Sequence, residues 1–272
     1  MNSSGDLSSL FYFAPMKKIQ ILTLTLLLSM TVSQSFAWGQ LGHYLIGYMA
    51  EKQMKKSTRK KVDKVLLPIS LGRSGTWMDE IRSDRAYNYA ETWHYLTSKT
   101  GEYDPAIQEK TGDAYEAIQR IKAELKAGGL DPKMEAEKLK MLIHMVEDIH
   151  QPLHVGTGDD RGGNDIKIEY FGRATNLHAL WDSGMIDGQG MSYSEIGDEL
   201  FRRINPELQT KYRSASMQDW LKEAVSYRPM IYNLPENKKI SYQYGYENYH
   251  IAEERMIAAS VRLAQILEEI YP

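Results

Sequence analysis

The sequence predicts a mainly α-helical fold with one short β-hairpin. Long segments carry apolar residues at spacings of three and four, which is the period of an amphipathic helix. Only residues 166–171 alternate apolar and polar side chains as a strand does, and they follow the turn-forming sequence Gly162-Gly163-Asn164. No repeat, low-complexity tract or proline-rich linker divides the chain after residue 37, so we expect a single domain with one core.

Six segments have the helical spacing. The last is representative, since Ile251, Ile257, Val261 and Leu267 would lie on one broad apolar stripe of a terminal helix. The predicted helices cover residues 41–54, 113–126, 135–149, 193–204, 217–226 and 248–270. One strand among these helices does not make a sheet domain, so we expect only a minor hairpin.

The start of the chain has the parts of a secretory signal. A positive start at residues 16–18 precedes an apolar run at residues 19–30, and small residues follow up to Ala37. We expect cleavage between Ala37 and Trp38. The apolar run is too short to span a membrane comfortably and no second one follows, so we expect an exported chain, periplasmic or secreted, without stable membrane insertion.

Cleavage there divides the chain into an N-terminal extension with its signal, residues 1–37, and a functional domain, residues 38–272. The formal net charge is −3 for the whole chain and becomes −4 for the domain, because two lysines and one aspartate leave with the signal. A strongly basic nucleic-acid-binding surface is therefore excluded on net charge, although local patches are not. The chain has no cysteine, so its stability must come from its core or from metal ions.

The seven histidines are therefore the first candidates for metal ligands. His144 and Asp148 lie four apart in a predicted helix, about 40° apart around its axis, so both side chains point the same way. His178 and Asp182 repeat this spacing. An imidazole and a carboxylate on one helical face form half of a zinc site. Two such pairs favour metal binding over the alternative of surface hydrogen bonds or buried core histidines.

Further donors follow the first pair. Pro152 should end the helix, because the residue before a proline is disfavoured in the α conformation, and His154 then lies just beyond it, free to face a second metal ion. His150 lies about 240° around the helix from His144, so we interpret it as a core histidine or as one that supports a ligand. The remaining candidate donors are Asp79 and His94, and His250 is interpreted as a packing residue.

Several motifs occur along the domain in this order: WGQLGH at the expected mature N-terminus, WMDEIR, WHY, HMVEDIHQPLH, GGN, NLHALWD and the closing ASVRLAQILEEIY. Together they resemble the zinc-dependent, single-strand-specific nucleases of fungi and plants, the family of mung bean nuclease and the plant type I nucleases. The resemblance implies one mainly helical nuclease domain, residues 38–272, with three zinc ions at the bottom of a cleft. The implied ligands are Trp38 through its backbone amine and carbonyl, His43, Asp79, His94, His144, Asp148, His154, His178 and Asp182.

The resemblance also implies how these ligands divide. One zinc would be held by Asp79, His94, His144 and Asp148, a second by Trp38, His43 and a bridging Asp148, and the third by His154, His178 and Asp182. Closely spaced zinc ions lower the pKa of a bridging water, so that hydroxide can attack phosphorus in line, and the third ion can stabilise the departing 3′-oxygen. Asp79 would orient the attacking hydroxide, and the guanidinium group of Arg82 would bind the phosphate through its two forked N–H groups.

The implied activity is hydrolysis of single-stranded DNA and RNA to 5′-nucleotides, with removal of phosphate from 3′-nucleotides. Three dications can hold phosphodiesters without a basic protein surface. Tyr95, next to a ligand histidine, would stack on a base, the alternative being a core tyrosine. Asn164 would lie near the substrate or support the site. Thr97 stands where the fungal enzymes carry an aspartate that contacts the base, so no base preference is implied.

Two other functions compete with the nuclease. A zinc-dependent phospholipase C shares the helical three-zinc architecture. Its pattern, however, has glutamate as the last ligand and a longer gap between the tryptophan and the first histidine. Asp182 and the shorter Trp38 to His43 spacing of this chain favour the nuclease. A non-catalytic exported zinc-binding protein would have closed sites with four protein ligands per ion. Nine donor residues shared among three ions leave open positions, so we expect an enzyme, and a monomeric one.

Trp38 would become a ligand only after cleavage. A free α-amine has a pKa of about 7.7–8.0, so zinc displaces its proton at modest cost, and the amine and carbonyl of one residue form a compact chelate. Before cleavage the same nitrogen is an amide and cannot bind zinc. We therefore predict that a chain retaining Ala37 binds one zinc ion fewer.

Overall fold

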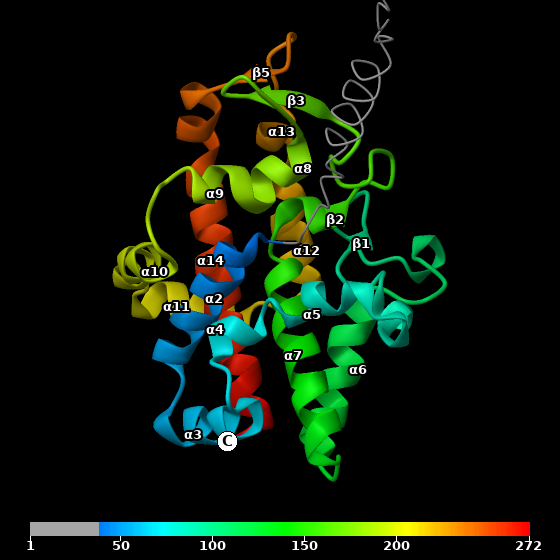
Figure 1. Ribbon diagram of the computed structural model, residues 1–272, viewed down its shortest axis with the longest axis vertical. Coiled ribbons are helices and arrows are strands. Elements are labelled where there is room, and N and C mark those ends of the chain that lie inside the picture. The colour runs from blue at the N-terminus through cyan, green and yellow to red at the C-terminus, as the bar shows by residue number, and fades with distance from the viewer. Residues whose placement is uncertain (1–37) are drawn as a thin grey trace, which may run out of the picture. The chain divides into compact units, whose positions relative to one another are not determined.

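Helices make up most of the regular structure, which confirms the predicted fold class. The computed structural model describes residues 38–272, and the expected signal, residues 1–37, lies outside the described residues. The longer helices are α2 (Gln40–Gln53), α3 (Lys56–Leu66), α6 (Ala114–Ala127), α7 (Pro132–Asp148), α10 (Tyr193–Arg202), α11 (Pro206–Ser214), α12 (Met217–Ser226) and α14 (Tyr242–Ile270) (Figure 1).

Short elements join these helices. Single α-helical turns are α4 (Leu71–Ser74), α5 (Trp77–Glu80), α8 (Leu177–Ala179), α9 (Met185–Asp187) and α13 (Arg228–Ile231). Turns of 3₁₀-helix cover Ile81–Ser83, Arg85–Ala90, Pro105–Ile107 and Pro152–His154, and a π-helical turn covers Leu180–Gly184. The strands are β1 (Leu96–Thr97), β2 (Val155–Gly156), β3 (Lys167–Tyr170), β4 (Arg173–Asn176) and β5 (Lys239–Ile240).

Side-chain caps fix where several helices begin. The carboxylate of Asp113 accepts from the backbone N–H of Glu116 at the start of α6. Ser192 and Ser216 each form a capping box at the starts of α10 and α12. Asp131 caps α7 and a proline occupies its first turn, so this helix begins three residues earlier than the apolar pattern alone predicts.

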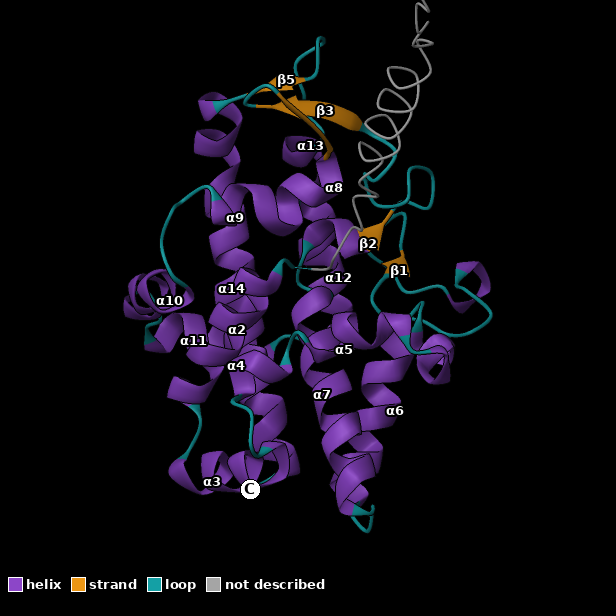
Figure 2. Cartoon of the chain, viewed as in Figure 1, coloured by secondary structure: helices purple, strands orange, loops and turns teal. Residues whose placement is uncertain are grey.

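The predicted hairpin is present and belongs to a slightly larger sheet. Strands β3 and β4 pair antiparallel with Ile168 opposite Thr175, and β5 adds to β3 in parallel (Figure 2). The turn between β3 and β4 places Phe171 and Gly172 at positive φ, 48° and 79°. A second sheet pairs β1 with β2 in parallel, and the sequence did not predict it because each strand has only two residues.

Three helices form the centre of the core. Helix α2 packs along α14, and α7 packs against both α14 and α6 (Figure 1). The buried side chains include Leu45 and Met49 of α2, Leu142 of α7, and Ile257 and Leu263 of α14. Burying each such side chain contributes about 1.5–3 kcal/mol. This packing brings the first turn of α2 to the last turn of α7, where the predicted ligands His43, His144 and Asp148 lie.

Two predictions about helices were incomplete and one about a side chain was wrong. Helices α3 and α11 were not predicted, because most of their residues are polar and only a few face the core. Helix α14 begins six residues earlier than predicted. His250 is exposed and not a packing residue, since the buried face of α14 at this level passes through Asn248, Ile251 and Ala252.

Among residues 38–272, no helix is both long enough and apolar enough to cross a bilayer.

Candidate metal centre

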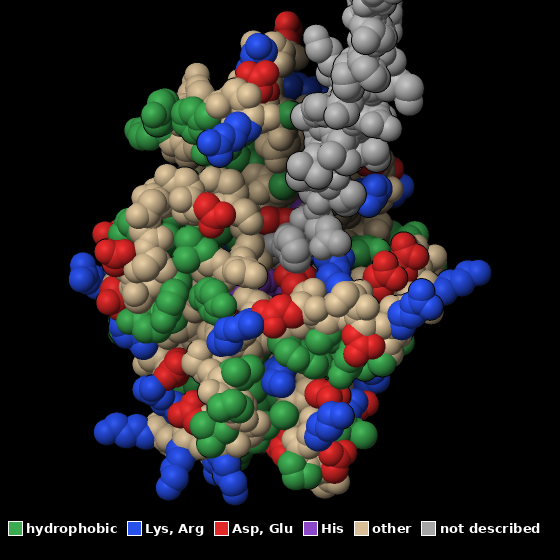
Figure 3. All heavy atoms as spheres, in the orientation of Figure 1, with side chains coloured by type: hydrophobic (Ala, Val, Ile, Leu, Met, Phe, Trp, Pro, Cys, Tyr) green, Lys and Arg blue, Asp and Glu red, His purple; other side chains and the backbone are tan. Residues whose placement is uncertain are grey.

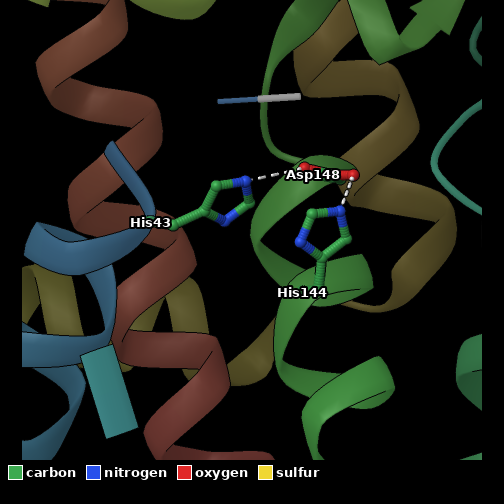
Figure 4. A group of neighbouring side chains, drawn as sticks. All are labelled: His43, His144 and Asp148. Atoms are coloured by element: carbon green, nitrogen blue, oxygen red, sulfur yellow. Dashed lines mark ion pairs between the residues drawn. The ribbon is translucent and has the colours of Figure 1, made fainter. Parts of the chain in front are cut away.

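Asp148, in the last turn of α7, lies between two histidines. Its Oδ1 atom is 3.5 Å from Nε2 of His43, which comes from the first turn of α2, and its Oδ2 atom is 2.8 Å from Nε2 of His144, one turn earlier on α7 (Figure 4). All three side chains are fully buried. The i, i+4 spacing therefore places His144 and Asp148 on one face of α7, as predicted. The two oxygens of the Asp148 carboxylate face different imidazoles.

Asp79 and His94 complete a second group on the other side of Asp148. Nδ1 of His94 lies 3.2 Å from Asp148 Oδ2 and 3.8 Å from Asp79 Oδ1. The same nitrogen lies 2.8 Å from Nε2 of His144. The ligand atoms of Asp79, His94 and His144 lie within 4.8 Å of one another, as do those of His43, His144 and Asp148. Two groups thus share His144, and Asp148 touches both.

His154, His178 and Asp182 form the third group. Nε2 of His154 lies 3.6 Å from Asp182 Oδ1, Nε2 of His178 lies 3.2 Å from Asp182 Oδ2, and the two rings stack. His154 follows Pro152 in the 3₁₀ turn, outside α7 as predicted. His178 lies in α8 and Asp182 in the π-helical turn that follows, so a regular α-helix was the wrong expectation for this pair. The wider π turn still leaves both side chains on one side.

Backbone carbonyl groups orient three of the imidazoles by hydrogen bonds to Nδ1. Nδ1 of His144 donates to the carbonyl oxygen of Gly75 at 2.5 Å, and Nδ1 of His178 donates to that of Gly162 at 2.7 Å. Nδ1 of His154 donates to the carbonyl oxygen of His94 at 2.8 Å. With Nδ1 held by a carbonyl group, each of these rings turns Nε2, the atom that can bind a metal ion, toward its group.

Burial and neighbouring charges set the pKa values of the metal-free groups. Burial lowers the pKa of His94 to about 4 and raises that of Asp79 to about 6. For His154, burial is outweighed by the carboxylates of Asp148 and Asp182, which raise its pKa to about 9. Burial would raise the pKa of Asp148, yet His144 and His154 hold it well below its usual value. Asp148 is therefore held ionised among the imidazoles, which favours a cation beside it.

Sequence reasoning missed two buried polar residues beside this centre. Glu147 Oε2 lies 2.6 Å from Nδ1 of His43, and Gln151 donates from Nε2 to Asp182 Oδ1 at 2.6 Å. Both stand inside the HMVEDIHQPLH motif, next to predicted ligands or between them. The available signal was a charged or polar residue within a buried segment, but the sequence did not indicate which distant residue each would contact.

The predicted substrate residues lie around the centre. Arg82 Nη1 is 3.6 Å from Asp79 Oδ1, and the Arg82 side chain remains 38% exposed. Tyr95 is 38% exposed, which is more than a core tyrosine would be. The amide of Asn164 donates to the carbonyl oxygen of Arg161, in the loop that carries Gly162. In Figure 3 histidine side chains are visible beside acidic ones in the middle of the drawn face.

Two further predicted residues lie at the edges of this arrangement. The Trp38 side chain is fully buried and its Nε1 donates to the carbonyl oxygen of Glu147 at 2.9 Å, while the next residue, Gly39, donates from its backbone N–H to the carbonyl oxygen of Asp182 at 2.7 Å. His150 belongs to none of the three groups. It contacts Arg262 instead, as expected for a core histidine.

A helical protein that buries three groups of imidazole and carboxylate ligands around one aspartate is equipped to bind several metal ions. The family model described as S1/P1 Nuclease matches residues 38–272, from Trp38 to the last residue. The chain therefore belongs to the S1/P1 nuclease family. It is a hydrolase that acts on nucleic acids.

Relatives from plants and fungi agree with this assignment. Endonuclease 4 of Arabidopsis thaliana is 24% identical over 90% of this chain and 93% of its own length, and Endonuclease 2 of the same plant is 26% identical over 86% and 90%. Nuclease S1 of Aspergillus oryzae is 28% identical over 68% of each chain. The alternative of a non-catalytic protein loses its support, and the nuclease assignment is favoured over a phospholipase.

Proposed function

We propose that this nuclease hydrolyses single-stranded DNA and RNA to 5′-nucleotides and removes phosphate from 3′-nucleotides, with three zinc ions as cofactors. The convergence of the three buried His/Asp groups around Asp148 carries this proposal, since Asp148 Oδ2 also lies 3.8 Å from Nδ1 of His154 in the third group. Family membership supports the nuclease activity, and the ligand chemistry supports the metal. The domain that does this work is residues 38–272.

The residues present fit zinc. Several buried ligand atoms have no hydrogen-bond partner among the described residues: His43 Nε2, Asp79 Oδ1, Asp148 Oδ1 and His154 Nε2. A buried polar atom without a partner costs about 1–3 kcal/mol, so four of them around one centre need a compensating ligand. Imidazole nitrogens mixed with carboxylate oxygens are the donor set that zinc takes in catalytic sites.

The three ions would use the predicted ligands in three sets. Asp79, His94, His144 and Asp148 form the first set, Trp38, His43 and Asp148 the second, and His154, His178 and Asp182 the third. Zinc bound there would supply positive charge that acidifies water and neutralises the phosphate. The two oxygens of Asp148 already face His43 on one side and His94 and His144 on the other, which supports a bridging role for this carboxylate.

The protein's own groups bind and orient the substrate. Asp79 Oδ1 would accept a hydrogen bond from the attacking water and fix its direction toward phosphorus. Arg82, close to Asp79 and partly exposed, would donate its forked N–H groups to the phosphate oxygens as negative charge builds up there. The exposed ring of Tyr95 would stack on a base, which is worth about 1–3 kcal/mol with little sequence preference.

Neighbouring residues would support this arrangement. Asn164 braces the loop that carries Gly162, whose carbonyl oxygen orients His178. Thr97 replaces the aspartate of the fungal pattern, so no base preference follows. Duplexes would be poor substrates, because their phosphates and bases cannot enter one cleft together.

Export would prepare the N-terminus. We infer that the mature enzyme is a monomer, periplasmic or secreted, that begins at Trp38. The family match begins at this same residue, and the Trp38 indole is anchored on Glu147, next to Asp148 in the chain. This supports a mature N-terminus placed for metal binding.

One experiment tests the proposed function. The protein beginning at Trp38 is assayed on single-stranded DNA, 3′-AMP and phosphatidylcholine, with and without a chelator, and its metal content is measured. We expect cleavage of DNA and 3′-AMP that chelation abolishes and zinc restores. Asp148→Asn should lose activity by at least about 100-fold, whereas Asp198→Asn, which removes an exposed carboxylate paired with Lys52, should retain it. Preferential cleavage of phosphatidylcholine, or full activity without zinc, would contradict the proposal.

A further inference from the structure

Glu147 is a fully buried carboxylate in α7 that the proposed chemistry does not use. It lies between His144 and Asp148 in the sequence, and no lysine or arginine pairs with it among the described residues. Its Oε2 atom lies 2.6 Å from Nδ1 of His43. An ionisable group without a cationic partner is costly to bury, so the position requires a specific compensating role.

The two ring nitrogens of His43 face different surroundings. Nδ1 points to Glu147, whereas Nε2 points to Asp148 Oδ1 at 3.5 Å and has no hydrogen-bond partner among residues 38–272. A carboxylate that accepts a hydrogen bond from Nδ1 fixes the proton there, and the lone pair then lies on Nε2. In this orientation His43 presents its ligand atom to the centre.

The place of Glu147 is also enclosed on other sides. A Cβ atom at residue 75 would collide with Glu147 Oε2 and displace this carboxyl group, and the carbonyl oxygen of Gly75 is the acceptor for Nδ1 of His144. The backbone oxygen of Glu147 accepts from Trp38 Nε1. Glu147 thus contacts the first residue of the described chain and the histidine of α2, and it lies beside the glycine that orients His144.

His43 differs from the other ligand histidines in the group that its Nδ1 faces. His144, His154 and His178 donate from Nδ1 to backbone carbonyl groups, while Nδ1 of His43 faces the carboxyl group of a side chain. The proposed second set, Trp38, His43 and Asp148, contains one carboxylate and shares it with the first set. The Glu147 carboxyl group, 2.6 Å from Nδ1, fixes the orientation of the His43 ring so that Nε2 faces this set.

We propose that Glu147 is a positioning residue for metal binding: its carboxylate holds His43 with the proton on Nδ1 and Nε2 facing the centre, and so strengthens binding of the ion held by Trp38 and His43. This inference rests on the proposed zinc centre. Glu147 is not among the proposed metal ligands and would act through His43.

Two substitutions separate geometry from charge. Glu147→Leu keeps most of the volume but removes the acceptor, whereas Glu147→Gln keeps an oxygen that can accept from Nδ1 and removes the charge. The matched control is Glu223→Gln, since Glu223 is a mostly buried carboxylate that pairs with Arg255 and Arg262 and contacts none of the proposed ligands. The control measures what losing a buried carboxylate does to the fold alone.

Zinc content and the protonation of His43 are the readouts. After dialysis against a weak chelator, Glu147→Leu should hold one zinc ion fewer than the unmodified protein, with affinity for that ion lowered by about 10–100-fold. Glu147→Gln should retain more of this affinity, and the control should retain all of it. In ¹⁵N NMR, His43 should show a protonated Nδ1 in the unmodified protein, assigned by comparison with His43→Gln, and should lose this signature in Glu147→Leu.

The outcomes separate this inference from the proposed function. Unchanged zinc affinity in Glu147→Leu, or a His43 ring without a proton on Nδ1, overturns the positioning role. An unmodified protein that binds no zinc and cleaves no nucleic acid overturns the proposed function instead, and the NMR signature of the metal-free chain still reports the Glu147–His43 contact. If Glu147→Leu does not fold, the graded loss in Glu147→Gln decides the question.

Discussion

His144 Nε2 lies 2.8 Å from His94 Nδ1, and both nitrogens are within 3.2 Å of the same oxygen of Asp148. Two buried imidazole nitrogens at this distance require a proton or a cation between them. The atoms around them, including His43 Nε2 and Asp148 Oδ1, lack hydrogen-bond partners among the described residues. A metal ion satisfies all of these atoms at once, so the centre should be stable only when it is loaded.

Metal removal should therefore destabilise the protein. A ligand present at about 1,000 times its dissociation constant stabilises the folded state by about 4 kcal/mol, and three ions act together. We expect a chelator to lower the melting temperature measured by calorimetry, and zinc to restore it. Asp148→Asn should show a much smaller difference between chelator and zinc. Equal melting temperatures with and without metal in the unmodified protein would contradict a loaded centre.

Gly162→Ala should weaken the third ligand group. Gly162 has φ +61°, and a Cβ atom there would collide with the Leu153 carbonyl oxygen and lie 3.3 Å from His178 Nδ1. The carbonyl that orients His178 must then shift. Gly172→Ala is the matched control, because Gly172 has φ +79° but open space around it. Both changes should cost about 1 kcal/mol in stability from the backbone conformation. Only Gly162→Ala should also lower zinc content and activity, and equal effects in both variants would refute the steric argument.

The parts of this centre that the sequence predicted are those set by local spacing. His144 and Asp148 meet because four residues make about one helical turn, and His154 leaves the helix because a proline follows its last turn. The long helices were predicted for the same reason. Capping residues such as Asp131 moved their boundaries, and the mainly polar surfaces of α3 and α11 concealed those helices from an apolar pattern.

The parts that the sequence did not predict depend on contacts between distant residues. Glu147 meets His43 across 104 positions, and the carbonyl oxygen of Gly75 meets His144 across 69. Neither residue type indicates its partner, since a glutamate in a helix is usually exposed to solvent. Only the packing of α2 against the end of α7 creates these contacts.

Extending the N-terminus should remove one zinc ion. Trp38 is held by its buried indole and by the hydrogen bond from Gly39 to the Asp182 carbonyl oxygen, so its backbone has little freedom to move. A protein that retains Ala37 has an amide in place of the α-amine, which cannot bind zinc at modest cost. We expect one ion fewer by elemental analysis and most activity lost, with the fold preserved by circular dichroism. Equal zinc content and activity in the two forms would refute the role of the free amine.

Acid should weaken the fold through Glu223, which pairs with Arg255 and Arg262 and with none of the proposed metal ligands. Burial raises the pKa of this carboxylate, but hydrogen bonds from Arg262 and Arg255 outweigh it and lower the pKa from 4.5 to about 2. A carboxylate with a lowered pKa in the folded state stabilises it above pH 4.5, and this stabilisation, about 3 kcal/mol, is lost as the pH falls toward 2. Urea unfolding in chelator, so that metal does not contribute, should show Glu223→Gln less stable than the unmodified protein at pH 6. The difference should narrow steadily as the pH is lowered below 4.5, because protonated Glu223 and glutamine are then both neutral beside the two arginines. A difference that stays constant over this range would mean that the ion pairs do not stabilise the folded state.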